Sequence, residues 1–128
     1  MFSTGVKRSL TARHFLAGDF GEESVPHNHP YEVELICRSR KLDRNGFSTD
    51  IAAMEAALED VLASIDDVLL NDLPFFQEKQ PSLENLAVYL SVELRRRLSE
   101  HNADPAEPLE IRIWEAPNAW ASYLEQRG

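Results

Sequence analysis

Apolar and polar side chains alternate over the first fifteen residues of the chain. One face of this segment carries Phe2, Val6, Leu10, Ala12 and His14. The intervening positions are largely polar or basic. A period of two residues is typical of a strand with one buried face. We therefore expect a strand over residues 1–15, followed by a loop over 18–24 that is rich in turn-forming residues.

The same alternation returns over about residues 27–38. One face of this second segment carries His27, His29, Tyr31, Val33, Leu35 and Cys37. The sequence Asp43-Arg44-Asn45-Gly46 is a turn signal, and a short strand through Phe47 and Ser48 would pair back after it. The first third of the chain thus has the pattern of paired strands.

From residue 50 the spacing of the apolar positions becomes helical. Asp50 can cap a first helix, and Pro74 would close that segment. Its apolar stripe consists of Ile51, Met54, Leu58, Val61, Leu62, Ile65 and Leu69. Ser82 can cap a second helix, whose leucines recur every four residues at positions 86, 90, 94 and 98.

Alternation resumes with Leu109, Ile111 and Ile113, and a turn over 116–119 leads to a returning strand over 120–124. The order of hairpin, two helices and hairpin predicts a single α+β domain over residues 1–128. Its four-stranded antiparallel sheet carries both helices on one face. The opposite face must then be solvated or covered by another subunit.

The composition of the chain limits the kinds of molecule that we expect it to bind. The net charge of −9 argues against nucleic acid, because neutralising phosphates dominates such binding. No apolar run approaches the roughly 20 residues that cross a bilayer, and no signal-peptide pattern is present, so we expect a cytoplasmic protein without a membrane partner. Cys37 is the only cysteine, which excludes an internal disulfide.

The candidate chemistry lies in the histidines. In His27-Asn28-His29 the two imidazoles are two residues apart, so a strand directs both toward the same side. His14 lies near the end of the preceding strand, and the three side chains converge if the two strands pair. Three neutral nitrogens with an open fourth position are typical of a catalytic Zn²⁺ site. The alternative is that these histidines are merely polar residues at a strand end.

A rival motif shares part of this pattern. His27, His29 and Glu34 also fit the spacing of the cupin metal signature. Glu34 falls on the strand face opposite His29, however, and cupins are built almost wholly of strands. The two amphipathic helices expected here argue against that fold.

Six short motifs, taken together and in this order, resemble the 6-pyruvoyltetrahydropterin synthase and 6-carboxytetrahydropterin synthase family. They are Ala12-Arg13-His14-Phe15, His27-Asn28-His29-Pro30-Tyr31, Asp50-Ile51, residues 65–72, residues 81–85 and Glu115. The resemblance spans almost the whole chain. It implies the T-fold, in which such sheets close into a homotrimeric barrel and two trimers commonly stack into a homohexamer.

The same resemblance implies roles for individual residues. His14, His27 and His29 would bind Zn²⁺. Glu115 would anchor a pterin, because a carboxylate accepts two parallel hydrogen bonds from the ring's amino group and N3–H. An ion pair with Arg112 or another basic residue is the alternative for Glu115. Glu84 is a weaker candidate for substrate binding, since a glutamate in the first helical turn already benefits from the helix dipole.

The chain departs from the family pattern at its proton-transfer residues. Family synthases carry a cysteine shortly before the paired histidines and an Asp-His pair after the first helix. Here the loop over 22–26 contains no cysteine, Asp66 is retained, and Asp67 stands at the histidine position. Glu23 occupies roughly the place of the cysteine and could be a general base, as in relatives that cleave the dihydroneopterin side chain. Glu22, or a merely solvated acidic loop, is the alternative.

These features predict a zinc-dependent lyase that acts on 7,8-dihydroneopterin or its triphosphate by rearrangement, elimination or C–C cleavage. Glu23, Asp66 and Asp67 are its candidate catalytic residues. A different class of function is a zinc- and pterin- or purine-binding paralogue without catalysis. A third is a zinc-dependent enzyme that acts on another heterocycle or a small carbonyl compound.

Overall fold

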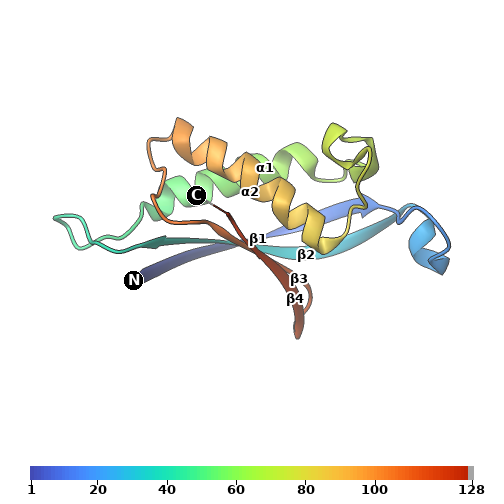
Figure 1. The fold of residues 1–128 in the computed structure, drawn as a ribbon, viewed down its shortest axis with the longest axis horizontal. Helices are drawn as coiled ribbons and strands as arrows, with labels where there is room; N and C mark the ends of the chain where they lie inside the picture. The colour runs from blue at the N-terminus through green and yellow to red at the C-terminus, as the bar shows by residue number, and fades with distance from the viewer. Residues whose placement is uncertain (127–128) are drawn as a thin grey trace.

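The computed structural model describes residues 1–126 and contains a four-stranded antiparallel sheet with both helices on one face (Figure 1). The strands are β1 (Phe2–His14), β2 (His27–Ser39), β3 (Glu110–Ala116) and β4 (Ala119–Leu124), in the spatial order β1-β2-β3-β4. The helices are α1 (Ile51–Ile65) and α2 (Leu83–Glu100). The expected α+β fold is therefore confirmed. The last two residues of the domain expected over 1–128 lie outside the described residues.

The pairing of β1 with β2 is continuous along the full length of both strands. It begins at Phe2 opposite Ser39 and ends at His14 opposite His27. Because side chains alternate across a strand, the core face of β1 receives Val6, Leu10 and Ala12. The same alternation carries His14 to the end of that face, beside the histidines of β2.

Both helices begin where the sequence predicts, at residues that cap them. The Asp50 carboxylate accepts a hydrogen bond from the Ala53 N–H, and the Ser82 hydroxyl accepts one from Asn85. The α2 leucines at positions 86, 90, 94 and 98 are fully buried against the sheet and α1. Within residues 1–126, neither helix is long and apolar enough to cross a membrane.

The first helix ends earlier than its apolar stripe suggests. It stops at Ile65 because the next two residues bind β1 instead of continuing the helix. The Asp66 carboxylate accepts a hydrogen bond from the Thr11 N–H, and the Asp67 N–H donates to the Thr11 carbonyl. Asp67 adopts a φ of 57°, a left-handed conformation that ends the helix. Leu69 lies beyond the helix and forms an isolated bridge with Arg13.

The expected short strand through Phe47 and Ser48 is wrong. Asp43 instead organises a closed loop, since its carboxylate accepts hydrogen bonds from the N–H groups of Asn45 and Phe47. The Ser48 hydroxyl contacts the Thr4 hydroxyl at 2.7 Å, so this segment meets β1 through side chains and not through a backbone ladder. Phe47 is left largely exposed.

The sheet face away from the helices is covered by its own long side chains. Lys7 lies 4.9 Å from the centroid of the Trp114 ring, and Arg112 lies 4.5 Å from that of Trp120. Arg112 also binds Glu110, which is almost fully buried and receives a second guanidinium from Arg38. The cations thus cover the tryptophans while their charges are paired or solvated.

The depth of the α2 leucines yields a stability test. Replacing Leu90 by Ala leaves a cavity in the core and should lower the free energy of unfolding by about 2–5 kcal/mol. Val92 lies on the same helix with 59% of its surface exposed, and Val92→Ala should change stability by less than about 0.5 kcal/mol. Denaturant unfolding of both variants measures the difference. Equal losses would show that α2 does not pack as described.

Candidate functional site

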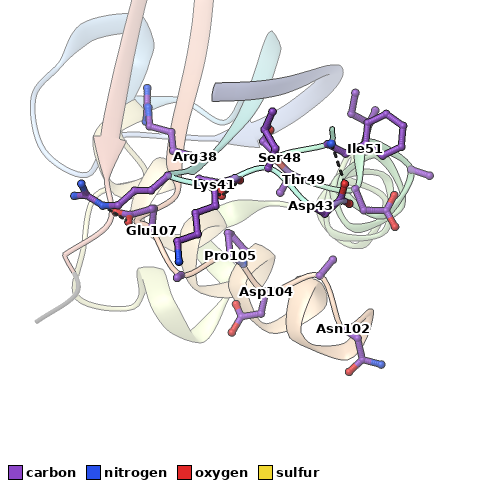
Figure 2. A pocket seen from close by; sticks show the side chains of 18 residues that line it. Arg38, Lys41, Asp43, Ser48, Thr49, Ile51, Asn102, Asp104, Pro105 and Glu107 are labelled. Carbon is purple, nitrogen blue, oxygen red and sulfur yellow. Dashed lines mark hydrogen bonds and ion pairs between the residues drawn. The ribbon is translucent and has the colours of Figure 1, made fainter. Parts of the chain in front are cut away.

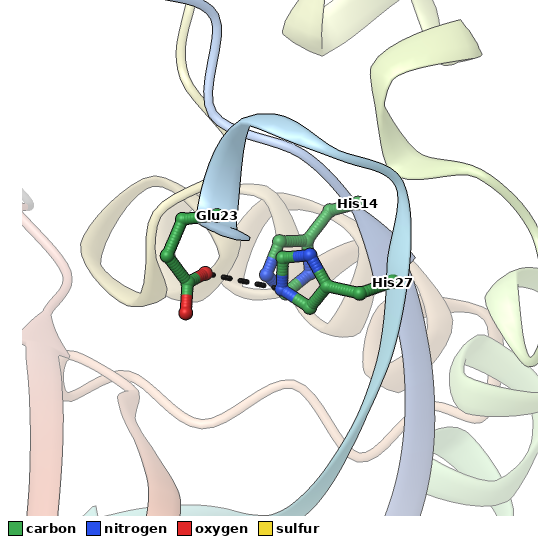
Figure 3. A group of neighbouring side chains, drawn as sticks. All are labelled: His14, Glu23 and His27. Atoms are coloured by element: carbon green, nitrogen blue, oxygen red, sulfur yellow. Dashed lines mark ion pairs between the residues drawn. The ribbon is translucent and has the colours of Figure 1, made fainter. Parts of the chain in front are cut away.

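Two histidines meet where β1 ends and β2 begins. Their register places His14 directly opposite His27, and the ring centroids lie 4.6 Å apart in an edge-to-face arrangement. Glu23 extends toward them from the connecting loop (Figure 3). Each of the three residues offers a ligand atom, and these atoms lie within 4.8 Å of one another. The geometry therefore assembles a potential metal-binding group from one buried, one partly buried and one exposed residue.

The loop between the strands holds Glu23 in a short 3-10 turn, η1 (Gly21–Ser24). The Leu16 N–H donates to the Glu23 carbonyl at 2.6 Å and fastens this turn to the start of the loop. The Ser24 hydroxyl accepts from the Phe20 N–H and donates to the Gly18 carbonyl. Gly21 adopts a φ of +66°, which a residue with a side chain rarely does. The loop conformation thus brings one carboxylate over the strand ends.

The tautomer of His27 is fixed by its surroundings. Nδ1 lies 2.8 Å from the Val25 carbonyl, which can only accept, so Nδ1 carries the proton. Nε2 of a neutral ring then presents a lone pair, and it lies 3.1 Å from a carboxylate oxygen of Glu23 without the alignment of a hydrogen bond. A lone pair facing a carboxylate is repulsive. A proton or a metal cation between the two atoms removes that repulsion.

His14 is suited to be a neutral ligand. It is only 4% exposed, and its Nδ1 has no hydrogen-bond partner among the described residues. Burial, and to a smaller extent the nearby His27 and His29, lower the pKa of His14 to about 4 against an opposing effect of Glu23. The ring is therefore unprotonated at neutral pH. An unpaired buried nitrogen in that state fits a bound cation.

His29, the third expected ligand, lies at the margin of this group. Its ring centroid is 6.3 Å from that of His14 and 6.4 Å from that of His27. A tetrahedral zinc ion bound by two imidazoles would place their centroids roughly 5 Å apart. The His14 and His27 rings are thus close to this spacing, whereas the centroid distances from His29 exceed it by about 1.3 Å. Two or three imidazoles with a carboxylate are a donor set that suits Zn²⁺.

Two side-chain amides that the sequence analysis did not single out hold the chain just after His14. Asn71 accepts from the Phe15 N–H and donates to the Phe15 carbonyl, both at 3.0 Å. Gln80 does the same to Ala17, at 2.9 and 2.8 Å. Each side-chain amide thus binds both backbone groups of one residue, as a neighbouring strand would. The only sequence signal was that Asn71 belongs to a quoted motif.

The other candidate site residues lie apart from the histidines. Asp66 and Asp67 bind Thr11 on β1, and Glu84 is exposed in the first turn of α2. No hydrogen bond or ion pair joins them to the histidines within residues 1–126. Glu115 is exposed near the end of β3, and the ion pair considered for it is absent from the described residues because Arg112 binds Glu110.

Tyr31 connects the histidines to Glu115. It is 5% exposed and lies two residues after His29 on the same strand face. Burial raises the pKa of its hydroxyl, and the charges of Glu115 and Glu23 raise it further. The phenol thus stays protonated and senses both carboxylates. Both carboxylates therefore lie close enough to Tyr31 for their charges to act on its hydroxyl.

A large hollow is lined by segments that lie at the end of the molecule opposite the loop between β1 and β2 (Figure 1), and Figure 2 shows its lining side chains. Its volume is about 1030 Å³, and it opens between the 38–52 segment and the loop after α2. Arg40 binds Glu107 at its edge, and Ile51 is an exposed apolar residue there. None of its lining residues is a histidine. The metal-binding group and this hollow are therefore separate features.

Comparison with known proteins places this architecture among pterin synthases. The family model described as 6-pyruvoyl tetrahydropterin synthase matches residues 4–126. The chain is 31% identical over 99 residues to 6-pyruvoyl tetrahydrobiopterin synthase of Drosophila melanogaster, a match that covers 76% of this chain and 56% of the fly protein. The chain thus spans little more than half the length of that relative.

Solved structures of the same description share the fold. The Caenorhabditis elegans 6-pyruvoyl tetrahydropterin synthase superposes with a TM-score of 0.82 at 22% identity, covering 98% of this chain and 96% of that one. A Plasmodium vivax 6-pyruvoyltetrahydropterin synthase, in which a catalytic glutamate is replaced by cysteine, gives 0.77 at 16% identity and covers 98% of both chains.

The histidine geometry predicts about one bound divalent ion per chain. His27→Ala should abolish binding, because it removes the nitrogen that faces Glu23. Elemental analysis of the purified proteins measures the metal content. His101→Ala is the matched control, since His101 is exposed at the end of α2 and should leave the metal content unchanged. Stoichiometric metal in a protein lacking His14, His27 and His29 would contradict the site.

Proposed function

Because the chain belongs to the 6-pyruvoyl tetrahydropterin synthase family, we propose that it is a zinc-dependent lyase acting on a dihydropterin. Its substrate in this proposal is 7,8-dihydroneopterin or the triphosphate of that compound, and the reaction changes the three-carbon side chain. The observation that carries the proposal is the convergence of His14, His27 and Glu23 at the ends of two paired strands. Membership of the family is the reason to propose a pterin substrate. The converging side chains are the reason to propose where the reaction takes place.

His14, His27 and His29 would hold the zinc ion. His14 is kept neutral by burial, and His27 is fixed in the ligating tautomer by Val25. When bound, the metal would supply Lewis acidity toward oxygens of the substrate side chain. The polypeptide then has to orient the pterin and move its protons.

Glu23 is the proposed general base. Its side chain is about half exposed, so a substrate can reach it, yet it lies beside His27. A carboxylate in this position can remove a proton from a side-chain carbon or hydroxyl next to the metal site. A glutamate is a catalytic residue in the Plasmodium vivax synthase, which supports the same role here. The lone cysteine, Cys37, lies in the core, and burial raises the pKa of its thiol to about 12.

Glu115 is the proposed pterin anchor. Its carboxylate is exposed and carries no ion pair within residues 1–126, so both oxygens can accept from the amino group and N3–H of the ring. The charge of Glu115 helps to raise the pKa of Tyr31, which lies beside His29. This electrostatic contact supports a substrate that spans Glu115 and the metal site. Glu84, exposed at the start of α2, is proposed as a secondary contact to the substrate.

Asp66 and Asp67 are proposed to take part across a subunit boundary. Both lie at the outer edge of β1, where they bind the backbone of Thr11, and are separate from the histidines of their own chain. In a closed trimer the part of this edge before Thr11 would pair with β4 of a neighbour, and the two aspartates would border the neighbour's site. The proposed assembly is therefore a homotrimer, or a homohexamer of two trimers.

A zinc- and pterin-binding protein without catalysis is the second candidate. The specific observation in its favour is the pair of replacements at proton-transfer positions. By the resemblance, Asp67 stands where family synthases carry a histidine, and the loop over 22–26 lacks their cysteine, since Cys37 lies in the core. Such a protein would keep the metal and the anchor Glu115 and would bind dihydropterins without converting them.

The proposed roles separate the effects of two matched substitutions. Glu23→Gln removes the base and should lower turnover of 7,8-dihydroneopterin compounds by about 10²-fold while leaving zinc and pterin binding intact. Glu115→Gln turns one acceptor oxygen into a donor facing the ring N–H groups, so it should weaken pterin affinity instead. Fluorescence titration measures binding, and mass spectrometry of the products measures turnover.

Three outcomes would revise these roles. Loss of zinc from Glu23→Gln would make Glu23 a metal ligand and not the base. Equal small losses in both variants would contradict both assignments. Tight pterin binding without turnover in the unaltered protein would favour the second candidate function.

The assembly is tested by mass in solution. Sedimentation equilibrium should give three or six chains per particle, because the exposed edge of β1 would be paired in a closed ring. Ser9→Pro should weaken this edge, because the Ser9 N–H lies on the same side of β1 as that of Thr11, which faces away from β2. A monomer at micromolar concentration would contradict the barrel.

A further inference from the structure

We propose that Tyr31 is the positioning residue for His29, and that the imidazole is held beside the candidate metal centre by stacking on the buried phenol ring. This inference rests on the proposed function, since it treats His29 as the third zinc ligand. It assigns to an aromatic side chain the orienting role that hydrogen bonds usually have around metal-binding histidines.

The hydrogen bonds of the two β2 histidines differ in strength. Nδ1 of His27 lies 2.8 Å from the Val25 carbonyl, a normal hydrogen-bond distance. Nδ1 of His29 lies 3.4 Å from the Pro30 carbonyl, near the limit of a hydrogen bond. The ring of His29 therefore needs another partner to fix its orientation.

Tyr31 is that partner. The centroids of the His29 and Tyr31 rings lie 4.6 Å apart with an angle of 22° between their planes, which is a stacked contact. Tyr31 itself is 5% exposed and belongs to the hydrophobic core, where it lies opposite Leu10 in the β1–β2 register. A ring packed in this way cannot swing away, so it offers the imidazole a fixed surface.

The stack also aligns His29 with His14. The plane of the Tyr31 ring lies within 7° of that of His14, at a centroid distance of 6.0 Å. The His29 and His14 planes differ by 17°. Tyr31 thus sets two imidazoles parallel, while His27 meets both edge-on. Without this ring, His29 would gain the space to rotate away from the other two.

The ring carries this role, and the hydroxyl does not. No hydrogen bond of the Tyr31 hydroxyl to any residue in the range 1–126 accompanies the stacking. Tyr31→Phe therefore keeps the surface on which His29 lies. Tyr31→Leu removes that surface but retains an apolar side chain for the core.

Zinc affinity measured by competition with a fluorescent chelator tests the inference without any assay of activity. Tyr31→Leu should bind zinc about 10- to 100-fold more weakly, whereas Tyr31→Phe should match the unaltered protein. Tyr89→Leu is the control, because Tyr89 packs on Phe75 and Phe76 and its ring contacts no histidine among the described residues. Its zinc affinity should not change. Tyr31→Met replaces the leucine variant if circular dichroism shows that the latter is unfolded.

A double substitution distinguishes positioning from general loosening of the core. In a His29→Ala background, Tyr31→Leu should cause no further loss of zinc affinity, because the ligand that it positions is already absent. An additional loss of the same size as in the unaltered background would overturn the inference. So would unchanged zinc affinity in Tyr31→Leu alone. An unaltered protein that binds no zinc would instead contradict the proposed function itself.

Discussion

The antiparallel register between β1 and β2 is the constraint on which the site depends. It sets His14 against His27 and Ala12 against His29, and it is continuous over both strands. A slip of one residue would turn every side chain of one strand to the other face. His14 would then leave the core side, and its burial, its lowered pKa and its approach to Glu23 would all be lost. The alternation of apolar residues along β1 thus determines the position of the His14 imidazole.

The elements that the sequence predicted correctly are those governed by local rules. Alternation located the strands, and the capping residues Asp50 and Ser82 located both helix starts. The spacing of His27 and His29 identified the strand end where the site forms. The errors arose where hydrogen bonds of side chains compete with the pattern of apolar residues. Asp66 ends α1 by binding Thr11, and Asp43 closes a loop where a strand was expected. The amides of Asn71 and Gln80 were missed because their partners lie more than fifty residues away.

The two faces of the sheet have different physical roles. The face under the helices is apolar until it reaches the histidines, where burial keeps an imidazole neutral. The opposite face is built of cations laid over tryptophans and paired with Glu110. Such a surface tolerates water and needs no second layer to cover it. The polar side chains of the site can therefore lie at one end of a core that is otherwise apolar.

The amide contacts made by Asn71 and Gln80 also determine which part of the connecting loop can open locally. They bind both backbone groups of Phe15 and of Ala17, which ties the first residues of the connecting loop to the 71–80 segment. The segment with Glu23 is held by hydrogen bonds among residues 16–25, so local opening there leaves the strand ends paired. In the proposed function, a pterin would then enter and leave without disturbing the imidazoles. The residence time of a zinc ion at the histidines would thereby be independent of the exchange of the pterin.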